Sequence, residues 1–215
     1  TLMGRGARFL GRTLTERNFP EYLETLAHEA ERAWKQYEMV LIPGVELTKN
    51  ALRDQDSAHI IGLGVSEFIS ADADIIEIVH KIKAQGAIAI AAHPVDTRKK
   101  ERQTHLLWSR REELASLFDA WEVASGPYWF DEVAATNLPK IASSDFHGPL
   151  QMKSWKTLLH CERNAEAILL AIKEQRIDFK FFDFPCMQEL LRSPEKRNVS
   201  KAWNDKIFDW SLTLF

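Results

Sequence analysis

The residues best suited to chemistry in this sequence are acids and histidines that end short apolar segments. Asp145 and His147 follow one such segment, and alternate residues of an extended chain project to the same side, so both could contact one ion. Glu46 and His93 end two other apolar segments. A carboxylate together with a neutral imidazole suits zinc, manganese or iron, whereas magnesium alone favours oxygen ligands. These residues therefore predict a metal site.

Each candidate also has a plainer structural interpretation. Asp145 could cap the next helix while His147 lies exposed, and His93 could be an ordinary core histidine. Glu46 follows apolar residues, where a buried unpaired carboxylate is costly, so a cation or an arginine must neutralise it. His59 begins its apolar segment, and core packing explains it nearly as well as metal ligation. We favour the cation because several separate segments end in suitable ligands.

The elements that must position these residues alternate along the chain. Apolar runs predict strands over 40–48, 59–64, 88–94, 120–123, 140–145 and 156–160, and three- and four-residue spacings predict helices over 20–37, 72–85, 110–118 and 164–175. Asp72 is the expected N-cap of the second helix, and Gly86 is its expected end. This alternation predicts βα units and a mainly parallel sheet, with functional residues at the carboxyl ends of the strands.

The composition limits the class of protein. A chain of 215 residues with 45% apolar residues predicts one large globular domain, and a net charge of -3 argues against nucleic-acid binding driven by counterion release. The 2 cysteines are too few for a disulfide framework or a cysteine-based zinc cluster, which favours a cytoplasmic setting. No apolar run reaches the roughly 18–20 residues of a membrane span, and no signal peptide opens the chain, so we expect no membrane partner.

With these residues in place, the chain resembles the PHP (polymerase and histidinol phosphatase) superfamily of metal-dependent phosphoesterases. The similarity covers about residues 40–182 and rests on the motifs Ile42-Pro43-Gly44-Val45-Glu46, His59-Ile60-Ile61-Gly62-Leu63-Gly64, Ala92-His93-Pro94 and Ser144-Asp145-Phe146-His147. It is strongest to small bacterial proteins that resemble nucleoside 3′,5′-bisphosphate phosphatases and 5′-3′ exoribonucleases. The segment from Thr157 to Arg176, a strand and then a helix, is also similar.

The resemblance implies an α/β fold, a distorted (β/α)7 barrel of the PHP type that here lacks its first strands. This barrel domain would span residues 1–183, and a C-terminal extension would follow over 184–215, where the composition shifts. At the carboxyl ends of the strands the family holds two or three divalent ions, Mn, Zn or Fe. The family's metal ligands map onto Glu46, His59, His93, Asp145 and His147.

The implied reaction is hydrolysis of a phosphate ester of a nucleotide or short oligonucleotide, so the expected partner is a small phosphorylated substrate or a short nucleic acid. The metal ions would activate water, and His93 or His147 would act as the proton donor wherever it is not occupied as a ligand. Arg98 and Lys99 could contact the phosphate, although we favour a solvated run of charges as their explanation.

One part of the family pattern is missing. The family begins with a strand that carries a His-x-His pair and a nearby Asp, and a second strand that ends in Asp-His; neither motif occurs here. A barrel without two strands exposes sheet edges, so we expect an oligomer or a completing segment to cover them. The alternative function is a truncated or degenerate PHP-like domain that binds or scaffolds without catalysis. Hydrolysis of C–N bonds is a third interpretation, because amidohydrolase barrels use similar His/Asp sites.

Overall fold

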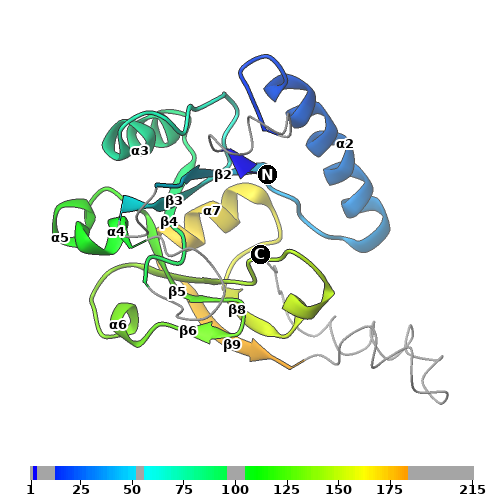
Figure 1. The fold of residues 1–215 in the computed structure, drawn as a ribbon. Coiled ribbons are helices and arrows are strands. Elements are labelled where there is room, and N and C mark those ends of the chain that lie inside the picture. Colours follow the sequence, from blue (N-terminus) through cyan, green and yellow to red (C-terminus); the bar gives the residue numbers. More distant parts are fainter. Residues whose placement is uncertain (1, 4–12, 52–55, 96–104, 184–215) are drawn as a thin grey trace.

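A mixed sheet forms the centre of the molecule. The computed structural model describes residues 2–3, 13–51, 56–95 and 105–183. The sheet has seven strands: β1 (Leu2–Met3), β2 (Gly44–Lys49), β3 (Ala58–Leu63), β4 (Ile88–Ala91), β5 (Ala120–Ser125), β6 (Tyr128–Trp129) and β7 (Lys140–Ser143). The first six lie side by side in chain order, and β7 pairs with β5. A separate antiparallel pair is formed by β8 (Ser154–Leu159) and β9 (Ile177–Phe182) (Figure 1).

The predicted (β/α)7 barrel is wrong, because the strands of the described part of the chain form an open mixed sheet and a two-stranded ribbon rather than a closed ring. The predicted mainly parallel pairing is also wrong at β3, which runs antiparallel to both of its neighbours, β2 and β4. For β2 and β3 the reason is the connection from Lys49 to Ala58, which is shorter than the dozen or more residues that a parallel crossover requires. Parallel pairing is kept between β4, β5 and β7.

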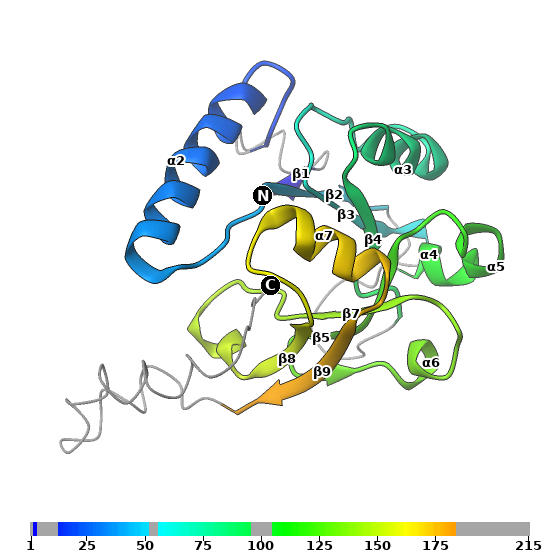
Figure 2. The ribbon, with the colours of Figure 1, turned by 180° about the vertical axis from the view of Figure 1, so that it is seen from behind.

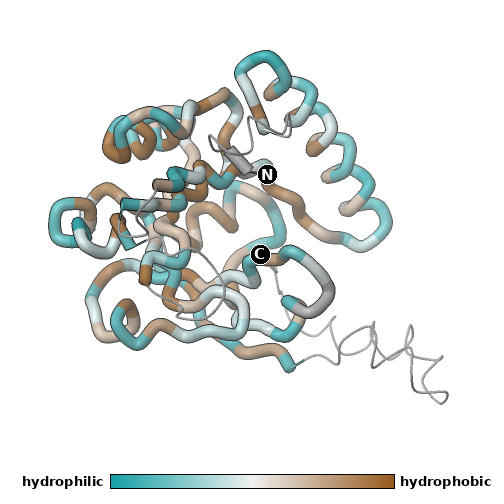
Figure 3. Tube along the Cα trace, in the orientation of Figure 1, coloured by the Kyte–Doolittle hydropathy of each residue, from teal (hydrophilic) through white to brown (hydrophobic). Residues whose placement is uncertain are grey.

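Both faces of the sheet are covered. Ile88 and Ile90 of β4 face a core that includes Ile168 and Ile172 of α7 (Ala165–Lys173). The alternate residues face a larger core with the helices α3 (Ile75–Ala84), α4 (Leu106–Ser109), α5 (Arg111–Leu114) and α6 (Asp131–Ala134). Helix α7 lies across the front of the sheet in Figure 2, and the hydrophobic residues in Figure 3 gather on the strands and on the helix sides that face them.

The helices begin and end where local chemistry allows. Asp74, rather than the predicted Asp72, caps α3, and its side chain accepts a hydrogen bond from the backbone N–H of Ile76 at 2.8 Å. Asn164 caps α7 in the same way, through the backbone N–H of Ala167 at 2.8 Å. The predicted helix over 110–118 is only the short helix α5, and another short helix, α4, precedes it; Arg110 leaves helical geometry between the two.

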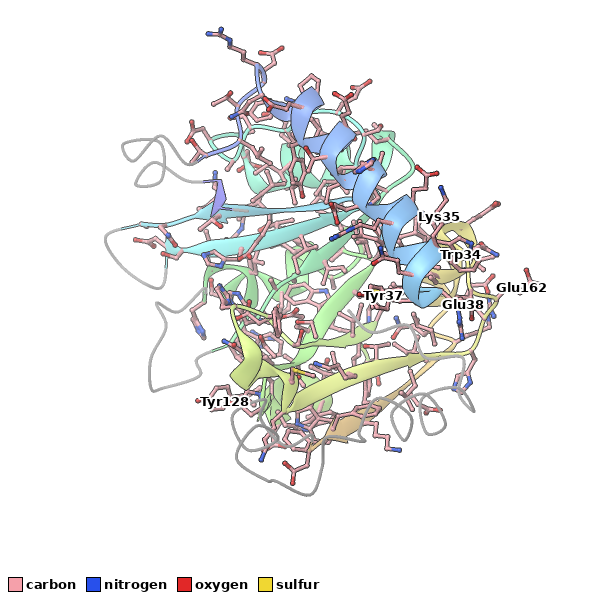
Figure 4. All side chains as sticks on the ribbon, turned by 90° about the vertical axis from the view of Figure 1, so that its right-hand side faces the viewer. Trp34, Lys35, Tyr37, Glu38, Tyr128 and Glu162 are labelled. Carbon is pink, nitrogen blue, oxygen red and sulfur yellow. The ribbon has the colours of Figure 1, made fainter. Side chains whose placement is uncertain are left out.

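The N-terminal helix α2 (Phe19–Tyr37) confirms the prediction for 20–37 and lies on the outside of the molecule (Figure 4). Only Phe19 is buried, whereas Trp34 is 50% exposed and Tyr37 is 68% exposed near its carboxyl end. None of the helices in the described residues is long and apolar enough to cross a membrane.

Candidate metal centre

Three of the predicted ligands meet at one end of the β2, β3 and β4 strands. Glu46 lies in β2, His59 lies in β3, and His93 follows the last residue of β4 by two positions. The antiparallel register places Glu46 opposite Ile61, two residues from His59, so the two side chains emerge on the same face. The backbone N–H of Ala92 donates to the carbonyl oxygen of His59 at 3.1 Å, which brings His93 beside them.

The ligand atoms of these residues lie within 4.8 Å of one another. His59 Nδ1 is 2.6 Å from Glu46 Oε1 and 3.3 Å from His93 Nε2, and His93 Nε2 is 3.8 Å from Glu46 Oε1. The three side chains are partly buried, so the site has walls of protein but keeps access to solvent.

The donor set fits a divalent metal ion. A tetrahedral ion with ligands about 2.0–2.1 Å away holds its ligand atoms about 3.3–3.4 Å apart, and two of the three observed separations, 3.3 Å and 3.8 Å, are close to that value. The third, at 2.6 Å, is the hydrogen bond between Glu46 and His59 that forms without an ion. Two histidines and one glutamate with an open position are typical of catalytic zinc sites and of sites for non-haem iron.

A second interaction orients His59 for ligation. Its Nε2 is 3.1 Å from Oδ1 of Asn50, an amide oxygen that can only accept a hydrogen bond. A proton therefore belongs on Nε2. Nδ1 donates to Glu46 in this structure, and it would offer its lone pair to an ion that replaced that proton. A hydrogen-bond partner on the remote nitrogen is the usual support of a metal-binding histidine.

The charges at the site are strongly coupled. Burial by itself raises the pKa of the Glu46 carboxyl, but its interactions with His59 and His93 outweigh burial and hold that pKa well below its usual range. Burial alone lowers the pKa of His93, yet contact with Glu46 and the negative charges of Glu122 and Asp145 raise it to about 9. Without an ion, His93 is thus a cation at neutral pH and takes the place of the positive charge that the carboxylates require.

Glu122, the most buried acid at the site, was not predicted from the sequence. It is 1% exposed in the middle of β5, where it accepts hydrogen bonds from the backbone N–H of His93 at 2.7 Å and from the hydroxyl of Ser143 at 2.6 Å. Burial raises the pKa of Glu122 to about 7, although the positive charge of His93 and the Ser143 hydrogen bond favour its ionised form. The sequence feature that could have identified Glu122 is its position as the one charged residue in the mostly apolar strand Ala120–Ser125.

Glu122 links the two strand ends that carry His93 and Asp145. Ser143 is the last residue of β7 and precedes Asp145 by two positions. Both His93 and Asp145 have positive φ angles, 26° and 47°, a region that costs energy for residues other than glycine. Such backbone strain clusters at functional sites, where neighbouring contacts maintain it.

Asp145 and His147 stand apart from the three-residue group. Asp145 is near enough for its charge to act on His93 and Glu122, but its carboxylate is not among the atoms within 4.8 Å. His147 is 63% exposed, and its Nδ1 contacts the carbonyl oxygen of Asp145 at 2.8 Å. Ligation by these residues stays a prediction, as does the phosphate contact by Arg98 and Lys99, which lie outside the described residues.

Comparisons with known proteins do not assign the chain to a family. No protein-family model matches the chain, and a search of curated proteins also found no match. The resemblance to the PHP superfamily therefore stays a prediction from the short sequence motifs.

Proposed function

We propose that this chain is a metal-dependent phosphoesterase of the PHP type that hydrolyses a phosphate ester of a nucleotide or short oligonucleotide. The observation that carries the proposal is the group formed by Glu46, His59 and His93. Their ligand atoms lie within 4.8 Å of one another, and their side chains are partly buried. The four motifs on which the resemblance rests supply the expected substrate class. A divalent cation held there supplies Lewis-acid chemistry, which polarises a phosphoryl oxygen and makes water more acidic.

The chain's own residues have distinct roles in this proposal. Glu46 contributes the negative charge that attracts the cation. Asn50 accepts a hydrogen bond from Nε2 of His59, the ring nitrogen that faces away from the cation. Glu122 holds the backbone of His93 from within the sheet. His147, which is exposed beside Asp145, or His93 where it is not a ligand, would give a proton to the leaving oxygen.

The first test is metal content. Purified protein dialysed against Mn²⁺ or Zn²⁺ should retain bound metal in elemental analysis, and Glu46→Gln and His93→Gln should lose it. His160→Gln is the matched control, because His160 is an exposed histidine that contacts Asp178 at 2.8 Å and takes no part in the group. A folded wild-type protein that retains no metal, with Asp145→Ala also without effect, would end the proposal.

The second test is turnover. The Mn²⁺-loaded protein should hydrolyse bis(p-nitrophenyl) phosphate and adenosine 3′,5′-bisphosphate, and should leave a panel of amides intact. Cleavage of the amides alone would assign the chain to C–N bond hydrolysis. Metal binding without turnover of any substrate would assign it instead to the non-catalytic binding or scaffold module.

A further inference from the structure

Strand β9 is an open edge strand. Within the described residues it pairs with β8 alone, and Figures 1 and 2 both show it near the lower border of the molecule. The register of the two strands runs without a shift from end to end, and the sequence of β9, Ile-Asp-Phe-Lys-Phe-Phe, contains no proline. Proteins usually protect an edge strand with a bulge, a proline or several charges, because its unpaired backbone groups can bind another strand. The structure therefore has a site for strand pairing at β9.

A hydrogen bond beside the ribbon shows which backbone groups of β9 point outward. The backbone N–H of His160 donates to the carbonyl oxygen of Arg176 at 3.0 Å, and these two residues lie one step beyond the last pair of the β8–β9 register. Hydrogen-bonded and non-hydrogen-bonded pairs alternate in an antiparallel ladder, so the even-numbered residues of β9 direct their N–H and C=O groups toward β8. The odd-numbered residues direct theirs away from it. Within the described part of the chain no hydrogen bond reaches these outward groups, which belong to Ile177, Phe179 and Phe181.

The side chains of β9 alternate between the two faces of the ribbon. Phe179 packs against the larger core, with its ring centroid 6.0 Å from that of Trp129. Asp178 and Lys180, on either side of it, project to the opposite face and are exposed. Asp178 contacts His160 at 2.8 Å, and its carboxylate can accept a further donor. Phe179 is thus flanked by one acid and one base, so the strand is complementary in charge to itself when its direction is reversed.

We propose that β9 pairs antiparallel with β9 of a second copy of this chain, about a two-fold axis that passes beside Phe179. The outward backbone groups of the two strands then bond to each other, and Ile177 covers Phe181 of the second copy, a side chain that is 39% exposed here. Asp178 lies directly opposite Lys180 of the second copy, and the symmetry repeats this pair.

The charges select this register. Sliding the second copy by two residues in either direction would place Lys180 opposite Lys180 or Asp178 opposite Asp178, and like charges directly opposite each other are destabilising. A strand of unrelated sequence would not satisfy both charges by necessity, whereas a reversed copy of β9 does. The inference concerns assembly and goes beyond the proposed reaction, and none of its tests uses metal or turnover.

The first test is sedimentation equilibrium of the full chain, which should show a reversible equilibrium between monomer and dimer. Asp178→Lys and Lys180→Asp each place like charges opposite each other at both pairs, so each variant alone should dimerise at least about tenfold more weakly. An equimolar mixture of the two variants should regain wild-type affinity, because both pairs then have opposite charges. Lys81→Asp is the control: it makes the same change of charge at an exposed residue of α3, which pairs with Glu77, and should dimerise as the wild type does.

The second test is hydrogen exchange followed by NMR, which identifies the strand that pairs. The amide of Phe179, which points outward, should exchange more slowly as the protein concentration rises, whereas the amide of Lys180 should be protected by β8 at every concentration. A chain that stays monomeric overturns the inference, and a Phe179 amide protected at every concentration would then assign the edge to another segment of the same chain. A dimer that both charge variants leave unchanged overturns it as well, because the interface then lies elsewhere.

Discussion

The raised pKa of His93 makes the stability of the metal-free protein depend on pH in a calculable way. The pKa is about 9 in the folded protein against an ordinary value of 6.5, so the folded state holds a proton that the unfolded state releases. The resulting stabilisation is fully present below about pH 6.5 and is lost as the pH rises through about 9. Integrating the difference in bound protons from pH 7 to pH 9 gives a loss of about 2 kcal/mol in the free energy of unfolding.

The assay is urea denaturation in the presence of EDTA, followed by circular dichroism at closely spaced pH values. Lys156 titrates in the same range with the opposite sign, because burial lowers its pKa to about 8 and stability rises as the pH passes that value. The His93→Gln variant keeps the Lys156 contribution, so the difference between wild type and variant removes Lys156 and leaves His93 together with Glu122, whose pKa the charge of His93 lowers. That difference should shrink by no more than about 2 kcal/mol between pH 7 and pH 9.

A saturating divalent metal should reverse this dependence. The ion binds neutral imidazole and must displace the proton of His93, so its affinity should rise with pH up to about 9. A difference between wild type and His93→Gln that stays constant over this range, or an imidazole that titrates near 6.5 by NMR, would refute the account of the charges at the site.

Other predictions follow from single contacts. Glu122→Gln keeps an acceptor for the His93 backbone and a donor for Ser143, so this variant should bind metal nearly as tightly as the wild type in isothermal calorimetry. Glu122→Ala leaves the backbone N–H of His93 and the hydroxyl of Ser143 unpaired, so it should weaken metal binding at least about tenfold. Equal effects of the two variants would show that the charge of Glu122, and not its hydrogen bonds, matters. Asp74→Ala removes the cap of α3 and should lower the free energy of unfolding by about 1 kcal/mol in urea, with no change in metal content. Zn²⁺ at about a hundred times its dissociation constant should stabilise the wild type by about 2.7 kcal/mol in thermal shift, and should not stabilise Glu46→Gln.

The pairing directions within the sheet show where the sequence-based fold prediction failed. Alternation of strands and helices is a local pattern, and it predicted β3, β5, α2 and α7 close to where they lie. Pairing direction depends instead on the length of each connection and on which neighbour covers the strand. The eight residues between Lys49 and Ala58 are too few for a parallel crossover, so β3 pairs antiparallel with β2.

The sequence by itself determined the chemistry available to this protein and most of its local elements, because capping, periodicity and ligand type are properties of neighbouring residues. It singled out Glu46, His59 and His93 as ligands, yet only the tertiary structure brought their atoms together from strands 13 to 47 residues apart. Burial was likewise decided by the fold. Glu122 is an ordinary glutamate by sequence, and its pKa rises to about 7 because both faces of β5 are covered. Within the described residues the hydroxyl of Thr48 has no hydrogen-bond partner, and this too depends on the segments that pack around the atom rather than on its neighbours in the chain.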